Sequence, residues 1–134
     1  ELFGGKNVAI FALPGAFTPT CSNQHLPGFI EKSEELRGKG IDTIVCLSVN
    51  DAFVMGAWGK QQGASGKVMM VGDGNGELTE KLGLAMDGSG FGMGQRSLRY
   101  SMIVRDGVVE TLNVESNPGQ AVESGVENLL SQLG

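Results

Sequence analysis

Residues 8–21 of the chain read VAIFALPGAFTPTC, an apolar run that stops at Pro14-Gly15 and leads into a cysteine. The run at 8–13 predicts a buried strand, because a short continuous apolar stretch is typical of a strand covered on both faces. Thr18 suits a helix N-cap and Pro19 a first helical residue, so a helix is predicted to begin here. The stretch therefore predicts a strand, a tight loop and a helix that carries Cys21 in its first turn.

Four more strand-like runs and four helical patterns follow this stretch. The strands are predicted at 41–49, 68–71, 99–104 and 108–114, and the helices at 29–37, 51–62, 77–84 and 120–133. Asp106-Gly107 is a strong hairpin signal between the last two strands, and Asn117-Pro118 fits the start of the last helix. Alternating strands and helices predict parallel pairing, to which the hairpin adds antiparallel strands. The order indicates an α/β fold of the thioredoxin-like type, a three-layer sandwich with a central mixed five-stranded sheet flanked by helices.

The composition limits the class of protein. A chain of 134 residues, 40% hydrophobic and 19% charged, has the size and composition of one globular domain. The net charge of −5 comes entirely from residues 68–134, and the lack of a basic stripe argues against nucleic-acid binding. No apolar run approaches the roughly 20 residues of a membrane-spanning helix. Two cysteines and one histidine argue against a disulfide scaffold and against a zinc site.

The two cysteines are expected to differ in chemistry. In the first turn of a helix, Cys21 would meet backbone N–H groups and the positive end of the helix dipole, which favour the reactive thiolate. A small buried hydrophobe is the alternative for Cys21, and placement alone leaves both interpretations open. Cys46 lies in the middle of an apolar strand, which predicts burial and a raised pKa of its thiol. The pair is not a CxxC motif, so the dithiol chemistry of thioredoxin itself is excluded.

Few charged residues could support a thiolate at Cys21. Three arginines between residues 88 and 105 form the only basic island in the acidic half, and the first, Arg96, follows a glycine-rich run. An arginine there could lie against a backbone-lined pocket and hold an anion through paired donors, although any single arginine is more often solvated. His25 falls one helical turn after Cys21 and could contact it. As an imidazolium it would favour the thiolate, but a partly exposed helix histidine is at least as common.

These motifs together resemble the peroxiredoxins. Pro14, Thr18 and Cys21 match the PxxxTxxC active-site motif of that family, and Arg96 matches its distant active-site arginine. Longer strings typical of the type 5 branch, called type II in plants, stand at residues 14–21, 25–29, 46–58 and 106–115. The similarity covers nearly the whole chain, and it favours a reactive Cys21.

The resemblance implies a thiol-dependent peroxidase with an antioxidant role in redox homeostasis. Cys21 would be an exposed nucleophile that attacks hydrogen peroxide or an alkyl hydroperoxide and becomes a sulfenic acid. Arg96 would hold the thiolate and orient the peroxide, the Thr18 hydroxyl would hydrogen-bond sulfur and peroxide, and Pro14 would wall the pocket. No metal or organic cofactor is implied.

The resemblance also implies partners for the reaction. Animal members carry a resolving cysteine near the chain end, but residues 116–124 contain none, so an external thiol is expected to reduce the sulfenic acid. Glutathione with glutaredoxin, or thioredoxin directly, would supply that thiol. A homodimer packed near the active-site loops is expected, with no membrane or nucleic-acid partner.

The start of the chain bears on domain organisation and location. The family has a leading hairpin before the first strand, which is expected to be missing here, so that residues 1–134 form one thioredoxin-like domain. The chain opens at Glu1 rather than methionine, so a trimmed chain is expected. Its expected location is the cytoplasm, or an organelle if a transit peptide was removed.

Two functions of other classes are compatible with parts of the sequence. In a non-catalytic peroxide sensor, Cys21 would be oxidised once and a partner would detect the change. A thioredoxin-like binding module would need no reactive cysteine, but it leaves the co-occurrence of Pro14, Thr18, Cys21 and Arg96 unexplained. Turnover with a reductant would separate an enzyme from a sensor.

Overall fold

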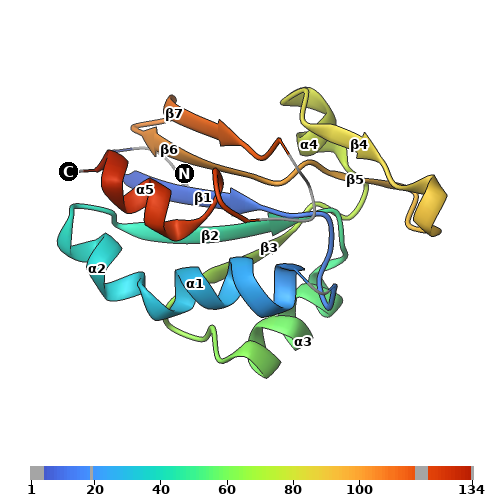
Figure 1. The fold of residues 1–134 in the computed structure, drawn as a ribbon, viewed down its shortest axis with the longest axis horizontal. Helices are drawn as coiled ribbons and strands as arrows, with labels where there is room; N and C mark the ends of the chain where they lie inside the picture. The colour runs from blue at the N-terminus through green and yellow to red at the C-terminus, as the bar shows by residue number, and fades with distance from the viewer. Residues whose placement is uncertain (1–4, 19, 117–120, 134) are drawn as a thin grey trace.

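A computed structural model describes residues 5–18, 20–116 and 121–133 of the chain. The main sheet contains β1 (Asn7–Ala12), β2 (Thr43–Ser48), β3 (Met69–Gly72), β6 (Tyr100–Arg105) and β7 (Val108–Val114). A separate two-stranded sheet, β4 (Ala85–Asp87) with β5 (Gln95–Ser97), lies beyond one end of the main sheet (Figure 1). The helical segments are η1 (Cys21–His25), α1 (Leu26–Glu31), α2 (Ser33–Gly38), α3 (Ala52–Gln62), α4 (Glu77–Lys81), η2 (Ser89–Phe91) and α5 (Val126–Gln132).

The main sheet is mixed, with strand order β3-β2-β1-β6-β7. β1 is its central strand and pairs in parallel with β2 and antiparallel with β6. The β6–β7 hairpin turns at Asp106 and Gly107, whose φ angles of 51° and 80° are those of a type I′ turn. The mixed five-stranded sheet and the Asp-Gly hairpin that the sequence predicts are therefore confirmed.

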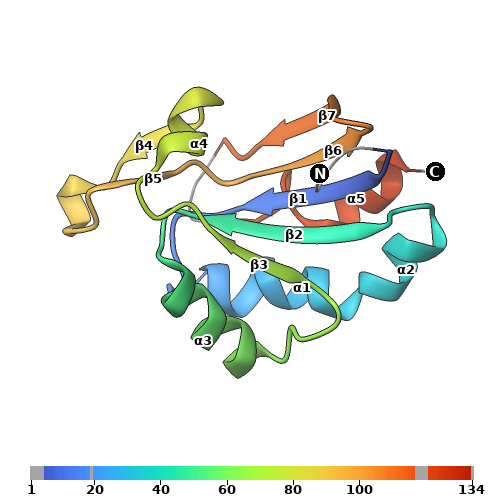
Figure 2. The ribbon, with the colours of Figure 1, turned by 180° about the vertical axis from the view of Figure 1, so that it is seen from behind.

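The residues of β1 alternate between two cores on opposite faces of the sheet. Ala9 and Phe11 belong to the larger core, which α1, α2, α3 and α5 cover with apolar side chains such as Trp58. Val8 and Ile10 face the other core, together with residues of β2 and β6. Figure 2 shows α1 and α3 on one side of the sheet and α4 on the other, which gives the predicted layers. Within the described residues, no helix is both long and apolar enough to cross a membrane.

The structure departs from the sequence prediction at two helices and at one small sheet. The last helix begins at Val126, not at 120, because residues 121–125 form turns, whereas Asn117-Pro118 lies outside the described residues. The helix predicted at 29–37 begins already at Leu26 and is broken at Lys32. Strands β4 and β5 were not expected, since three-residue strands carry too little apolar pattern to be recognised in a sequence.

The end of β3 lies very close to the loop after β2. A Cβ atom at Gly72 would lie 2.6 Å from the carbonyl oxygen of Asn50 and 2.9 Å from the carbonyl carbon of Asp51. Both neighbours are backbone, so they cannot turn away as a flexible side chain could. This loop also supplies the Asn50 side chain to the candidate site described below.

We predict that Gly72→Ala lowers the free energy of unfolding by about 1–3 kcal/mol, because the added methyl group must displace backbone. Gly56→Ala is the matched control: it lies in α3 with nothing within 4 Å of its Cβ position. The control should raise the free energy of unfolding by up to about 1 kcal/mol through helix propensity. Urea denaturation of both variants measures the two effects, and equal changes in the two would contradict the close approach at Gly72.

Candidate functional site

Cys21 begins η1, the helical segment that follows the loop from the end of β1. This segment is a π-helix: the N–H of Leu26 donates to the carbonyl of Cys21, five residues earlier. The next residue, Pro27, has no N–H. It fits the first turn of α1, where an N–H has no acceptor within the helix, and the π-helical turn of η1 leads directly into α1. Pro27 lies at the point where the π-helix becomes an α-helix.

The residues before Cys21 take only part of the predicted capping role. The carbonyl of Thr18 accepts a hydrogen bond from the N–H of Ser22 at 2.8 Å, as an N-cap carbonyl does. Its hydroxyl does not cap an N–H but donates to the carbonyl of Gly15 at 2.7 Å. The Thr18 side chain is therefore fixed against the Pro14-Gly15 loop, with its oxygen lone pairs left as acceptors. Pro19 lies outside the described residues.

The side chain of Cys21 is fully buried, at 0% exposure, which corrects the expectation of an exposed nucleophile. Its sulfur accepts a hydrogen bond from Nη2 of Arg99 at 3.2 Å. Arg99 directly precedes β6, and its neighbour Tyr100 pairs with Ala12 at the end of β1. Because the loop to Cys21 leaves from that end of β1, the antiparallel pairing brings the arginine to the sulfur.

The family resemblance implies that Arg96 holds the thiolate, but the arginine beside Cys21 in the structure is Arg99. Arg96 lies on β5, in the separate small sheet, and its Nε donates to the carbonyl of Met93 at 2.9 Å. Its Nη1 donates to the carbonyl of Pro14 at 3.4 Å and would lie 3.0 Å from a Cβ atom at Gly15. Arg96 thus binds backbone carbonyls and holds the loop before Cys21, whereas the hydrogen bond to the sulfur comes from Arg99.

His25 contacts the same arginine and is neutral. A guanidinium can only donate, so Nδ1 of His25 accepts from Nη1 of Arg99 at 3.0 Å. The proton therefore lies on Nε2, which donates to the carbonyl of Ser124 at 2.9 Å. Burial, followed by the charge of Arg99, lowers the pKa of His25 to about 3, although the Ser124 hydrogen bond opposes this. Neither the imidazolium nor the partly exposed histidine considered from the sequence is present.

The loop between β1 and Cys21 is held from both sides. The N–H of Ala16 donates to Oδ1 of Asn50 at 3.0 Å, and the hydroxyl of Ser48 donates to the same oxygen at 2.7 Å. Phe17 has φ = 64°, in the left-handed region that a bulky residue rarely adopts, and its side chain is half exposed. The loop between β1 and Cys21, called the site loop below, thus has a backbone that is held by hydrogen bonds.

Cys46 is buried in the core, as predicted. It lies in β2 opposite Phe11 of β1, with 0% exposure. Burial raises the pKa of the Cys46 thiol well above its ordinary value; the nearby Cys21 also raises it and Arg99 partly opposes the effect. Cys46 is therefore a protonated core residue, in contrast to the sulfur that contacts an arginine.

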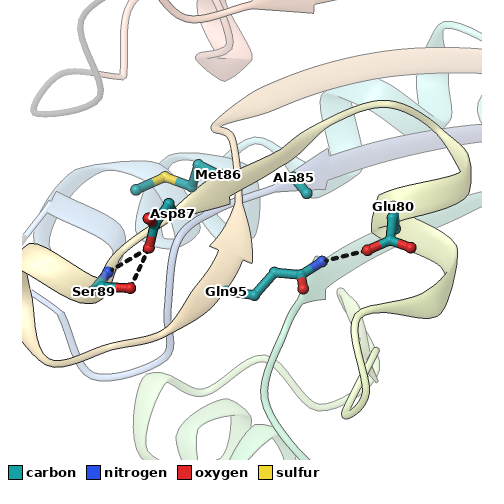
Figure 3. A pocket seen from close by; sticks show the side chains of 6 residues that line it. All are labelled: Glu80, Ala85, Met86, Asp87, Ser89 and Gln95. Carbon is teal, nitrogen blue, oxygen red and sulfur yellow. Dashed lines mark hydrogen bonds between the residues drawn. The ribbon is translucent and has the colours of Figure 1, made fainter.

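A polar depression of about 440 Å³ lies over the small β4–β5 sheet (Figure 3). It is lined by Glu80, Ala85, Met86, Asp87, Ser89 and Gln95. Its two carboxylates are engaged locally: Gln95 donates to Glu80 at 3.3 Å, and the N–H of Ser89 donates to Asp87 at 2.9 Å. The hydrogen bonds within this depression are local surface contacts. The buried charged and titratable side chains contact one another at Cys21.

Comparison with known proteins gives close matches over almost the whole chain. The Redoxin family model matches residues 1–130. The chain is 52% identical to Peroxiredoxin-2E, chloroplastic, of Arabidopsis thaliana over 135 residues, which cover 99% of this chain and 57% of that protein. It is 50% identical to Peroxiredoxin-2B of the same plant over 133 residues, covering 99% of this chain and 82% of that one.

Solved structures agree with these sequence matches. The crystal structure of reduced Prx3 from Vibrio vulnificus in complex with hydrogen peroxide aligns with a TM-score of 0.93 and 52% identity, covering 98% of this chain and 80% of that chain. The central sheet and flanking helices are thus those of a thioredoxin-like fold. The chain spans 57 to 62% of the length of the first three curated relatives that it matches.

We predict that His25 makes the protein less stable in acid. The folded chain does not take up the His25 proton until about pH 3, whereas the unfolded chain takes it up near the ordinary value of 6.5. The free energy of unfolding should therefore keep its full His25 contribution above pH 6.5 and lose it as the pH falls. The slope approaches about 1.4 kcal/mol per pH unit.

The control for this pH dependence is His25→Gln, which removes the only histidine in the sequence. Carboxylates titrate in both proteins, so the difference in slope between the two isolates His25. Urea denaturation from pH 4 to 7 measures both slopes. Identical slopes between pH 5 and 6.5 would contradict a neutral buried His25.

Proposed function

Because the chain belongs to the peroxiredoxins of the Redoxin family, we propose that it is a thiol-dependent peroxidase that reduces hydrogen peroxide and alkyl hydroperoxides through Cys21. One observation carries the proposal: Nη2 of the buried Arg99 lies 3.2 Å from the buried sulfur. A cation next to a thiol favours the thiolate, which is the nucleophilic form of cysteine. Cys46 lacks such a contact and stays protonated.

The proposed reaction is a two-electron oxidation of the sulfur. The Cys21 thiolate attacks the terminal oxygen of the hydroperoxide, so an S–O bond forms as the O–O bond breaks. The sulfur becomes a sulfenic acid, and the departing oxygen takes up a proton and leaves as water or an alcohol. The peroxide is reduced by the two electrons that the sulfur loses.

The residues around the sulfur would divide the remaining tasks. The guanidinium of Arg99 would orient the peroxide oxygens and stabilise the charge that grows as the O–O bond lengthens. The hydroxyl of Thr18 donates a hydrogen bond to the carbonyl of Gly15. Its oxygen can therefore accept a hydrogen bond from the O–H of the peroxide. Pro14 would wall the pocket, and Arg96 would hold that wall through the Pro14 carbonyl.

The sulfenic acid would be reduced by a thiol from outside the chain. The sequence has two cysteines, and Cys46 is a buried, protonated core residue. We infer that glutathione with glutaredoxin, or thioredoxin directly, supplies the reducing thiol. That thiol forms a mixed disulfide with Cys21 and releases water, and a second thiol then restores Cys21.

We infer a homodimer that packs beside the site loop. Phe53 on α3 is 89% exposed and Phe17 on the loop is 50% exposed, and exposed large apolar side chains are typical of surfaces that another chain covers. Phe17 lies 6.3 Å from the ring of Trp58, whose Nε1 donates to Ser22 next to Cys21. A second copy that covered these rings would thus pack against the segment that carries the sulfur. We propose the cytoplasm or an organelle as the location of the protein.

We predict that Cys21→Ser abolishes peroxide turnover, whereas Cys46→Ala retains most of it, because Cys21 is the cysteine whose sulfur accepts a hydrogen bond from Arg99. Steady-state consumption of hydrogen peroxide, run side by side with glutathione/glutaredoxin and with thioredoxin, measures this. Equal loss in both folded variants would contradict the one-cysteine scheme. A single equivalent of peroxide consumed per thiol, without turnover under either reductant, would favour a sensor over an enzyme.

Replacement of Arg99 should slow the reaction of Cys21 with peroxide far more than replacement of Arg96. We predict that Arg99→Gln slows the reaction of Cys21 with hydrogen peroxide about a hundredfold, since it removes the charge and the donor at the sulfur. Arg96→Gln is the matched control, with the same charge change nearby, and should cost less than about tenfold. Single-turnover peroxide consumption checks both, with thermal unfolding as a test of folding. A larger loss in Arg96→Gln would return the central role to Arg96.

A further inference from the structure

A buried chain of hydrogen bonds leads from the end of β7 to the sulfur of Cys21. It starts at Glu115, which directly follows β7 and is only 6% exposed. A single carboxylate oxygen of Glu115 accepts from the N–H of Val122 at 2.9 Å, the N–H of Ser124 at 2.9 Å and the hydroxyl of Ser124 at 2.8 Å. The carboxylate therefore organises the turn at residues 121–125.

The turn at 121–125 in turn holds the arginine of the site. The carbonyl of Ser124, itself fully buried, accepts the Nε2 proton of His25, and Nδ1 of His25 then accepts from Nη1 of Arg99. The guanidinium is a planar, rigid fork, so fixing Nη1 also fixes the direction of Nη2 toward Cys21. The hydrogen-bonded chain thus consists of five buried residues, Glu115, Ser124, His25, Arg99 and Cys21.

We propose that Glu115 is a positioning residue for Arg99, acting through the Ser124 carbonyl and the neutral tautomer of His25. Without the carboxylate, the N–H groups of Val122 and Ser124 lose their acceptor, and Ser124 loses the charge-assisted bonds that fix it in the turn. The Ser124 carbonyl then no longer selects the tautomer with the proton on Nε2. A histidine with its proton on Nδ1 would turn a donor toward Arg99, and the guanidinium would be displaced from the sulfur.

This role is separate from the contribution of Glu115 to the sheet. The backbone N–H of Glu115 donates to the carbonyl of Arg99 at 2.8 Å, and this bond between neighbouring strands persists when the side chain is replaced. The side chain acts by a different path, through residues of the turn before α5. Substitution of the side chain therefore tests positioning of the guanidinium while the strand pairing is kept.

The test uses Glu115→Ala and Glu115→Gln in the Cys46→Ala background, which leaves one thiol. Two readouts are the near-ultraviolet absorbance of the Cys21 thiolate at pH 7 and the rate of reaction with hydrogen peroxide. We expect Glu115→Ala to lose about half of the thiolate absorbance or more and to react about tenfold more slowly. Glu115→Gln keeps an acceptor of the same shape and should stay within about threefold of the parent.

Glu123→Ala is the matched control. Glu123 carries the same charge, lies in the same turn and also accepts from a backbone N–H and a hydroxyl, both of Ser116, but it does not bond Ser124. The Glu123→Ala variant should match the parent within about twofold in its rate of reaction with hydrogen peroxide and in its thiolate absorbance. Equal losses in Glu115→Ala and Glu123→Ala would mean that the turn matters only for stability and would overturn the proposal.

A double-mutant cycle with His25→Leu tests the path. If Glu115 acts through His25, Glu115→Ala should have no further effect on the thiolate absorbance or the rate once His25 is replaced. A full additive loss in the His25→Leu background would overturn the proposal. Should Glu115→Ala fail to fold, the conservative Ser124→Ala, which removes only the hydroxyl bond, must lower the rate about threefold for the proposal to stand.

The kinetic part of the proposal rests on the proposed function, and the two can fail separately. A parent protein without peroxide turnover would refute the peroxidase, while the thiolate absorbance would still decide whether Glu115 positions Arg99. A parent with full turnover whose absorbance and rate ignore Glu115→Ala would refute the positioning role alone.

Discussion

The contact between the Arg99 guanidinium and the Cys21 sulfur is the interaction around which the site is built. A buried cation is unfavourable unless acceptors surround it, and those acceptors must not be protonated themselves. His25 meets this condition because burial and the arginine keep it neutral, so it can accept a hydrogen bond where a charged imidazole would repel. The neutrality of the only histidine in the sequence is thus a consequence of burial and of the arginine, and it allows His25 to accept the hydrogen bond from Arg99.

The sheet is what makes this contact possible. Cys21 and Arg99 are 78 residues apart in the chain, and no local motif joins them. The antiparallel register of β1 and β6 sets Ala12 beside Tyr100, and the loop after β1 then needs only a few residues to reach the arginine. Glu115 comes next to Arg99 through the same sheet, because its N–H bonds the Arg99 carbonyl. Two registers, that of β1 with β6 and that of β6 with β7, therefore align the cysteine, the arginine and the carboxylate.

Much of the fold could be predicted from the sequence, because continuous apolar strands and the Asp106-Gly107 turn are local signals. The candidate site could be predicted only in part. Cys21 follows from its own motif, but the choice between Arg96 and Arg99 depends on which sheet each strand joins, and three residues of spacing carry no such information. The start of the last helix was predicted too early because Glu115 binds the N–H groups of the turn at 121–125. That bond joins residues from two elements, and a pattern within one element cannot reveal it.

The backbone conformation at Phe17 has a further consequence for the evolution of the sequence at this position. A bulky residue in the left-handed region costs on the order of 1–3 kcal/mol, which glycine would avoid and asparagine reduce. Under selection for thermal stability alone, this position would drift toward one of those two residues. An aromatic ring kept there, half exposed and at the edge of the site, is therefore a trait that stability selection works against. Its persistence in a lineage would measure how strongly that lineage needs the surface beside the sulfur.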